Sequence, residues 1–295
     1  MQKSHQQQVT RLHNSETNGA IPYGSISATN INSLINTKLL EKTIECAIIS
    51  AYIKNEKPFS LLIVAVAESG KTTVMKQYRN NKGILYITDC TAYGITRDFL
   101  PKMVSGEIKT IMIPDLTTPL SKSAKTRATF IAFLNNLIEE GIAKITTYAL
   151  TWDREVNANI ITAVTRESLE DGRHEWAKMG FLSRLIVFSY SYNLATVVKI
   201  FNQYAEHGVK INNKKLKLPK KQIDIKLPIE IAEKLHPIAM KIGEQQKLYG
   251  FRALINFRVF LKALAYRNKR KTVTMQEFNE FLELSSYLNY DFNPL

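Results

Sequence analysis

The sequence has few cysteines and no long apolar segment, and these absences exclude several classes of protein. Cys46 and Cys90 are the only cysteines among 295 residues, and neither has the spacing of a metal site or a disulfide framework. No apolar run approaches the roughly 18 residues that are needed to span a bilayer. The first residues, MQKSHQQQVTRLHNSETNG, lack the apolar region of a secretory signal. We therefore expect a cytoplasmic protein in a reducing compartment, with no membrane segment.

Acidic residues are outnumbered by basic ones, with 26 Asp and Glu against 40 Lys and Arg, which gives a formal net charge of +14. Such an excess favours a polyanionic partner, usually nucleic acid, although a solvated basic surface would account for the same composition. Lysines are dense between residues 210 and 226, and residues 267–271 form a second basic cluster. Such clusters neutralise phosphates without regard to base sequence. In the first cluster the candidate nucleic-acid contacts are Lys214, Lys215, Lys220 and Lys221.

Large apolar residues are scarce in residues 1–30, which are rich in Gln, Ser, Asn and Thr. Such a segment cannot bury enough surface to offset the entropy lost on ordering, so we expect a flexible polar arm. From residue 31 to residue 54 apolar residues recur at helical spacing, in INSLINTKLLEKTIECAIISAYIK. This spacing predicts an amphipathic helix, which Pro58 separates from the next element.

Short apolar runs then alternate with helical patterns. The predicted strands cover residues 61–67, 84–88, 110–113, 159–164 and 185–190, with a further strand at 145–150. Short apolar strands separated by helices are typical of a parallel sheet that is covered on both faces. We therefore assign residues 31–195 to an α/β core. Residues 196–228 are expected to form a helix and a basic linker, and residues 229–295 an all-helical domain.

The stretch LLIVAVAESGKTTVMKQY, residues 61–78, has nearly the form of a phosphate-binding loop between a strand and a helix. In such a loop, backbone N–H groups surround the β-phosphate, a lysine neutralises the β- and γ-phosphates, and the next hydroxyl ligates Mg²⁺. Lys71 and Thr72 stand in those two positions. Ala65 replaces the first glycine of the pattern, which is tolerable if its φ angle stays below zero. The predicted phosphate contacts are Ala67, Glu68, Ser69, Gly70, Lys71, Thr72 and Thr73.

A second acidic position follows the predicted strand in TIMIPDL, where Asp115 comes directly after Pro114. An aspartate at the end of a parallel strand can hold Mg²⁺ together with Thr72, although it can also simply cap a turn. Leu116 stands next to it, where many hydrolysing enzymes of this type have a glutamate that orients the attacking water. Either the water is positioned from elsewhere, with Glu139 and Glu140 as candidates, or hydrolysis is slow.

The chain resembles the AAA+ ATPase superfamily, through AESGKTT, IMIPD, NIITAVT, GFLSRLIVF and YGFRALINF in that order. The resemblance covers about residues 31–295. The segments GFLSRLIVF and FRALINFRVFLKALAYRNKRKTVTMQEF are most similar to the minichromosome maintenance helicases and related proteins of archaea and mobile elements. We expect neither the N-terminal DNA-binding domain nor the C-terminal winged-helix domain of that family within this sequence. The resemblance implies a P-loop NTPase core with a helical lid, ATP and Mg²⁺ as ligands, and a source that is prokaryotic, viral or a mobile element.

The resemblance also implies roles for three residues. Thr165 matches a polar sensor of the γ-phosphate, where asparagine is commoner. Arg184, in FLSRL, matches the arginine finger that is offered to the nucleotide of a neighbouring subunit. Arg252, in YGFRAL, matches the lid arginine that reaches the γ-phosphate of its own subunit, and Arg258 is its rival. A finger that acts on a neighbour implies a ring or open spiral of identical subunits, typically a hexamer.

The sequence leaves the substrate of such an ATPase open. In DNA-handling relatives a hairpin is inserted where this chain has TTYALTWDREVNAN, residues 146–159, so Trp152 and Arg154 are candidate DNA contacts. Trp152 could equally be a core residue. We expect an ATPase that acts on DNA in replication or mobile-element maintenance. The alternatives are a nucleotide-gated assembly platform that recruits a partner protein, and a protein-remodelling ATPase.

Overall fold

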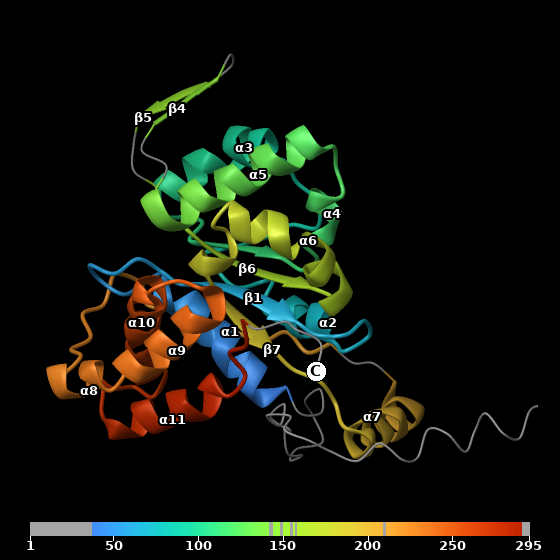
Figure 1. The fold of residues 1–295 in the computed structure, drawn as a ribbon, viewed down its shortest axis with the longest axis vertical. Helices are drawn as coiled ribbons and strands as arrows, with labels where there is room; N and C mark the ends of the chain where they lie inside the picture. Colours follow the sequence, from blue (N-terminus) through green and yellow to red (C-terminus); the bar gives the residue numbers. More distant parts are fainter. Residues whose placement is uncertain are drawn as a thin grey trace, which may run out of the picture.

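A parallel sheet of five strands lies at the centre of the fold (Figure 1). The computed structural model describes residues 37–141, 144–147, 150–153, 156, 158–208 and 211–290. The strands are β1 (Ser60–Val64), β2 (Ile84–Tyr86), β3 (Thr110–Ile113), β6 (Asn159–Val164) and β7 (Leu185–Ser189). They are hydrogen-bonded in the order β2-β3-β6-β1-β7, and every neighbouring pair is parallel. The predicted α/β class and each of its five core strands are confirmed.

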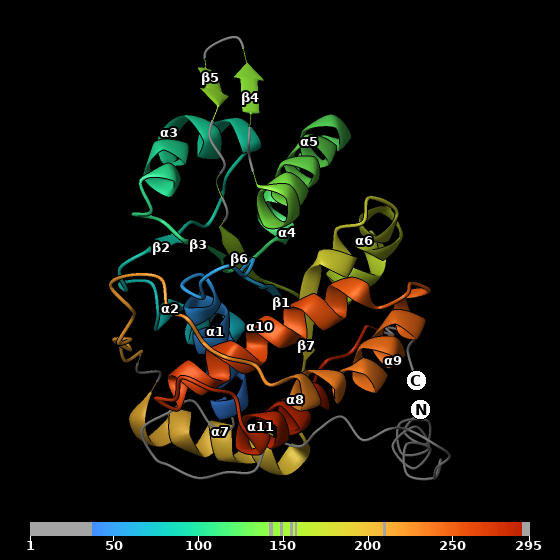
Figure 2. The ribbon, with the colours of Figure 1, turned by 90° about the vertical axis from the view of Figure 1, so that its left-hand side faces the viewer.

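Helices cover both faces of this sheet. On one side lie α3 (Ala92–Val104), α4 (Thr117–Leu120), α5 (Ala124–Asn135) with its π-helical continuation (Asn136–Glu140), and α6 (Arg166–Lys178). On the other side lie α1 (Lys38–Ser50) and the C-terminal helices α8 (Ile229–Glu233), α9 (His236–Gln246), α10 (Phe251–Arg267) and α11 (Met275–Ser285) (Figures 1 and 2). Two-sided cover explains why the strand sequences are almost wholly apolar: every residue of β1, β3, β6 and β7 is buried.

The C-terminal helices share one continuous apolar core with the sheet. The ring of Phe260 on α10 stacks on Phe59, which precedes β1, at a centroid distance of 4.9 Å. Phe281 of α11 packs against the same Phe260 ring at 5.6 Å. After α11, the Tyr287 carbonyl accepts a hydrogen bond from Ser189 N at 2.8 Å, so the chain covers the outer edge of β7. The helical region is thus anchored at the amino-terminal end of β1 and along β7.

The lysine-dense segment after the helix α7 (Leu194–His207) contains no helix in its described part and crosses the molecule as an extended strap, residues 211–228. Its backbone forms parallel bridges with the α1–β1 loop, through Ile223 and Ile53, and with the turn after α10, through Lys226 and Thr272. At its beginning, Lys214 N donates to the Gln77 carbonyl at 2.8 Å. The strap therefore connects the end of the helix after the phosphate loop to the C-terminal helices.

Two elements project from this body. The strand expected at 145–150 is found as one arm of an antiparallel hairpin, β4 (Lys144–Thr147) and β5 (Leu150–Asp153), which extends beyond α3 and α5 (Figures 1 and 2). Trp152 belongs to β5, but its side chain and all of Arg154 lie outside the described residues. The helix α7 (Leu194–His207) projects near the opposite end of the molecule. In the described part of the chain, no helix has the length and apolar character of a membrane span.

Candidate nucleotide-binding site

The phosphate loop joins β1 to α2 (Lys71–Lys76). Gly70 takes a φ of 84°, a left-handed conformation that only glycine adopts without strain, and it precedes the first residue of α2. Ala65 is fully buried and keeps a negative φ, so the condition under which alanine can replace glycine is met. Ala67 and Glu68 are exposed on the loop, and Thr73 is half-buried in the first turn of α2. The loop thus brings its backbone to a helix N-terminus, as anion binding requires.

Lys71 is held within the loop by three oxygens. Its Nζ donates to the carbonyls of Ala65 at 2.8 Å and Val66 at 2.7 Å, and to Ser69 Oγ at 3.2 Å. Burial lowers the pKa of this amine, while the negative charges of Glu167 and Asp115 act to raise it. A partly desolvated cation beside two carboxylates interacts strongly with any further charge that enters the site.

Two tyrosines at the end of β7 fix the loop from the side. The hydroxyls of Tyr190 and Tyr192 donate to the Ser69 carbonyl at 3.0 Å and 2.8 Å. Burial raises the pKa of Tyr192 to about 12, and that of Tyr190 further, so both stay protonated donors at neutral pH. Neither tyrosine was predicted from the sequence as part of the site. Their signal was the aromatic pattern SYSYN, which overlaps the end of the predicted strand 185–190.

Asp115 follows β3 and Thr72 lies in the first turn of α2, so both are at the carboxyl end of the sheet, and both are exposed. Asp115 Oδ1 accepts from Thr117 N at 2.9 Å and from the Thr117 hydroxyl, so the carboxylate also caps the short helix α4. Carboxylate and hydroxyl oxygens are ligands that Mg²⁺ accepts. The donor set therefore fits the predicted metal, and the capping role that the sequence left open is present as well.

Leu116 and Thr165 also lie at the carboxyl end of the sheet. The Leu116 side chain is fully buried and its backbone N donates to Ala163 O at 2.9 Å, so this position cannot offer a group to a water. Thr165 follows β6, which lies between β1 and β3, and therefore stands between the phosphate loop and Asp115. Its hydroxyl accepts from Ser168 N at 3.1 Å as the N-cap of α6.

Glu167 is a further acidic residue at this edge that the sequence analysis did not single out. It is exposed in the first turn of α6, and its charge acts on Lys71. A hydrogen bond from its own backbone N–H lowers the pKa of Glu167, with smaller contributions from the Thr165 hydroxyl, Arg166 and Lys71. It is thus an ionised carboxylate at neutral pH beside the loop lysine. Its signal in the sequence was an acidic residue two positions after the sensor candidate.

The two predicted arginines lie together, and one of the glutamates proposed to position water lies between them. Arg184 forms an ion pair with Glu139, and Arg252 Nε and Nη2 donate to the two carboxylate oxygens of Glu139 at 2.6 Å and 3.0 Å. Burial acts to raise the pKa of Glu139, but the hydrogen bond from Arg252 and the charge of Arg184 outweigh it and lower the pKa. Gly180 completes the cluster, because its carbonyl accepts from Arg184 Nη1 at 2.6 Å. We call these four residues the arginine cluster.

The arginine cluster lies at the opposite end of the sheet from the phosphate loop. Arg184 directly precedes β7, whose first residue Leu185 pairs with Ser60, the first residue of β1. The phosphate loop follows the last residue of the five-residue β1, and such a strand spans roughly 16 Å. Within one subunit, Glu139 and Arg252 therefore lie with Arg184 and away from Lys71. Arg258, the rival of Arg252, is exposed further along α10.

The predicted nucleic-acid lysines fall into two groups. Lys214 forms an ion pair with Glu41, a residue of α1 that is almost wholly buried, so its charge is engaged inside the protein. Lys215, Lys220 and Lys221 are exposed on the strap. In the described residues there is no group of three His, Cys, Asp or Glu side chains that could form a metal centre of their own.

The comparisons with known proteins bear on the fold. A protein from Cytophaga hutchinsonii, described as a "putative ATPase", matches with a TM-score of 0.51 and 13% sequence identity. The match covers 86% of this chain and 82% of that one, so the five-stranded parallel sheet and the helices that follow it are shared. Comparisons with family models and with curated proteins give no match.

Proposed function

We propose that this protein is an ATPase of the AAA+ type that binds ATP and Mg²⁺ between two copies of itself and acts on DNA. The observation that carries the proposal is the phosphate loop. Gly70 and the buried Lys71 begin α2 at the carboxyl ends of three adjacent strands, beside the side chains of Asp115 and Glu167. Ligands of open α/β sheets bind at this end.

Each residue of the loop has a task in this proposal. The backbone N–H groups of residues 67–73 surround the phosphates, and Lys71 leaves its carbonyl partners to neutralise the β- and γ-phosphates. Thr72 and Asp115 hold Mg²⁺, which neutralises charge on the phosphate oxygens when it is bound. In hydrolysis a water attacks the γ-phosphorus, and the bond from that phosphorus to the bridging oxygen of ADP breaks.

The arginine cluster supports a site that is shared between subunits. Arg184 and Arg252 are a strand length away from the phosphate loop of their own chain, so in this conformation they reach a nucleotide only in a second copy. For Arg252 this differs from the role within its own subunit that the family resemblance implies. A guanidinium that approaches from a neighbour stabilises the charge of the transferring phosphoryl group. A contact between unlike surfaces of identical subunits generates rings or spirals, of which a hexamer is the form that the family resemblance favours.

Exposed apolar groups flank both ends of the sheet and favour the same assembly. At the loop end, α7 begins two residues after Tyr192 and exposes Leu194 by 79% and Phe201 by 65%. At the other end, Tyr249 and Phe251 stack on each other beside Arg252 and are 83% and 70% exposed. Apolar patches of this kind mark interaction sites, and here each one adjoins one half of the proposed site.

Hydrolysis needs a group that orients the water, and the burial of Leu116 favours slow turnover unless another carboxylate serves. Glu139 belongs to the arginine cluster, whereas Glu167 lies beside Lys71. We assign the orienting role to Glu167. If it does not serve, the burial of Leu116 favours the second candidate function, a platform whose subunits are joined by ATP and that recruits a partner protein.

The assignment of DNA rests on the net charge of +14 and on the resemblance to the minichromosome maintenance helicases. The function that follows is a helicase or loader in replication or in mobile-element maintenance. Stimulation of the ATPase by DNA would support it. A rate that responds to an unfolded polypeptide and not to DNA would instead indicate protein remodelling.

Complementation between two inactive variants tests the shared site. Lys71→Ala subunits lack the loop charge but keep Arg184, whereas Arg184→Ala subunits keep the loop. Each variant alone is expected to be inactive, and a mixture should regain part of the steady-state ATPase rate, because some interfaces combine an intact loop with an intact arginine. A mixture that stays as inactive as its components would show that the arginine acts in its own chain or not at all.

A further inference from the structure

A groove of about 910 Å³ lies between the strap, residues 211–228, and the turn that follows α10. It is the place where the two basic clusters of the sequence meet. Lys217 and Lys226 line it from the strap, and Lys269 and Lys271 line it from the turn. All four side chains belong to exposed residues, and in the part of the chain that the structure describes none of them has an ion pair. Glu45, which pairs with Arg267, and Asp224 also line the groove, but the lysines outnumber these carboxylates and give the groove a net positive charge.

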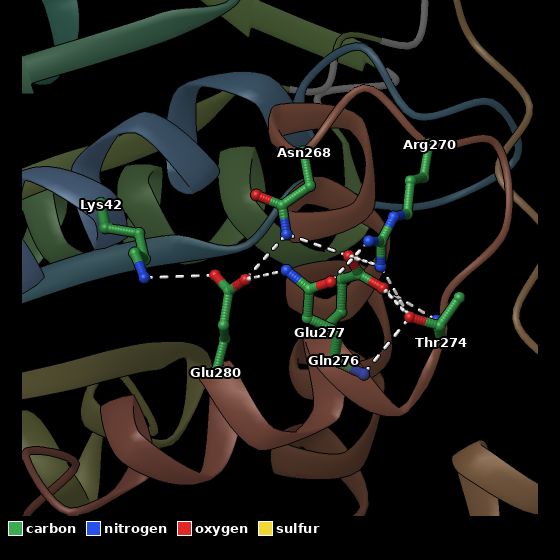
Figure 3. A network of polar contacts seen from close by, with 7 residues as sticks. All are labelled: Lys42, Asn268, Arg270, Thr274, Gln276, Glu277 and Glu280. Carbon is green, nitrogen blue, oxygen red and sulfur yellow. Dashed lines mark hydrogen bonds and ion pairs between the residues drawn. The ribbon is translucent and has the colours of Figure 1, made fainter.

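Hydrogen bonds hold the turn against the start of α11 and fix which of its side chains face inward. Asn268 and Arg270 donate to Glu277, each to Oε1, at 2.9 Å and 3.0 Å (Figure 3). Glu277 is fully buried in the capping box of α11. Because the residues at 268 and 270 are engaged in this network, the alternate residues Lys269 and Lys271 remain at the surface.

The strap is held in a matching way. Leu216, Leu218 and Ile225 pack against the core, whereas Lys215 and Lys217, on either side of Leu216, are exposed. The Lys226 N–H donates to the Lys271 carbonyl at 2.9 Å, and the Lys226 carbonyl accepts from Val273 N at 2.9 Å. These two hydrogen bonds join the strap and the turn side by side. Lysines that lie far apart in the sequence thus form one surface.

The groove combines this charge with an apolar lining. Ile49 and Tyr266 line it together with the apolar residues of the strap. Cations along a groove with an aromatic ring inside it suit a single strand of nucleic acid, whose phosphates need neutralising and whose bases stack on aromatic rings. A stiff duplex cannot enter a concave groove without deformation.

We infer that this groove binds the sugar-phosphate backbone of single-stranded nucleic acid. The inference deepens the proposed function, because it names the surface through which the ATPase contacts DNA. It differs from the prediction made from the sequence, in which Lys214 was a contact. Lys214 is engaged with Glu41, while Lys217, Lys226, Lys269 and Lys271 form the site.

Two charge-matched variants of the full chain test the groove. The groove variant carries Lys217→Gln, Lys226→Gln, Lys269→Gln and Lys271→Gln. The control carries Lys82→Gln, Lys125→Gln, Lys178→Gln and Lys241→Gln, all at exposed positions elsewhere. Binding of a labelled oligothymidylate of about 30 nucleotides is measured by fluorescence anisotropy at several salt concentrations, in the absence of ATP and ADP.

The groove variant is expected to lose affinity on the order of 10²-fold at low salt, with a salt slope that is smaller by about 3, since each phosphate contact on a single strand contributes about 0.7. The control should stay within about threefold of the natural chain. Equal loss in both variants would overturn the inference, because only net charge would then matter. Tighter groove-dependent binding of a duplex would also overturn it.

This binding test can fail or succeed separately from the test of the shared ATP site. Binding of oligothymidylate that depends on the groove lysines, measured without ATP, would support the groove even if Lys71→Ala and Arg184→Ala subunits failed to complement each other. Conversely, a groove variant that binds oligothymidylate normally, in a chain whose variants do complement, would remove the groove and leave the shared ATP site intact.

Discussion

The two ends of the sheet position their charged groups by different means. At the carboxyl end, the backbone positions the charged groups: Gly70 turns the loop, a helix begins at Lys71, and tyrosine hydroxyls hold the Ser69 carbonyl. At the amino end, side chains from three distant segments meet, because Arg184 and Arg252 both bind Glu139. The turn and helix of the first end are set by local sequence and only its tyrosines come from far along the chain, whereas the second end exists only after the chain has folded.

The difference has a functional side in the proposed assembly. The loop end offers one lysine and two carboxylates to a ligand with negative phosphates and a divalent cation. The arginine end offers two cations that a single carboxylate keeps in place. Neither end holds a complete set of groups for phosphoryl transfer, and together they do.

The largest expected effect comes from breaking the loop end. Lys71→Ala should abolish measurable binding of ATP, because no other residue of residues 65–73 supplies a cation there. Isothermal titration calorimetry with a non-hydrolysable ATP analogue measures this binding. Lys76→Ala, on the same helix but half-buried at its last turn, is the control and should bind normally. Retained binding in Lys71→Ala would exclude the loop as the phosphate site.

The next effect concerns the water. Glu167→Gln should lower the turnover number on the order of 10²-fold and leave the affinity for ATP nearly unchanged, since the amide keeps the shape and loses the charge. Single-turnover hydrolysis separates the two quantities. Glu170→Gln, one turn further along α6 and also exposed, serves as the control. If Glu167→Gln turns over normally, hydrolysis does not use this carboxylate.

At the other end, Arg252→Ala should reduce turnover by about 10²-fold, the typical cost of removing one donor to developing charge. Its rival offers the control, because Arg258→Ala removes an exposed arginine of the same helix outside the arginine cluster. The steady-state rate of assembled protein is the measurement. A larger loss in Arg258→Ala would reassign the lid arginine.

A smaller effect is expected from the tyrosines that fix the loop. Tyr192→Phe removes one of two hydrogen bonds to the Ser69 carbonyl, worth about 1 kcal/mol, so affinity for ATP should fall by about fivefold. Tyr204→Phe on α7 is the control. Thermal stability should change little in either variant. An unchanged affinity in Tyr192→Phe would mean that Tyr190 alone holds the carbonyl.

The most gradual effect is a dependence on pH. Burial lowers the pKa of Lys71 in the free protein, whereas bound phosphates favour its charged form. Affinity for ATP should therefore be highest below the pKa of free Lys71 and should decline as the pH rises through it, earlier than for an ordinary lysine near 10.4. Titrations between about pH 7 and 10 measure this decline. A flat profile would contradict a desolvated amine.

Features that depend on residues close together in the sequence could be predicted, whereas features that join residues far apart in the sequence could not. Strands, the loop and its glycine depend on neighbours along the chain, and the predicted order of strands and helices is found. The pairing of Lys214 with Glu41 joins residues that are 173 positions apart, so the lysine looked like one of many surface charges. The meeting of Arg252 with Glu139, and of the strap with the turn after α10, depends in the same way on how α10 packs.

Some misses had a different cause. The sequence left open how the water is positioned, with Glu139 and Glu140 as candidates, and did not single out Glu167, because the family motif does not mark that position. The side chains of the hairpin at residues 144–153 lie outside the described residues, so the roles of Trp152 and Arg154 stay predictions.

Gly180 illustrates how far from the chemistry a single position can matter. A β-carbon at this residue would lie 2.5 Å from the Arg184 guanidinium, and the φ of 69° already disfavours any other amino acid. In the proposed assembly, a mutation there would swing the finger away while the fold of its own subunit survives. The loss of activity would then occur in the neighbouring subunit, at a nucleotide that the mutated residue does not contact.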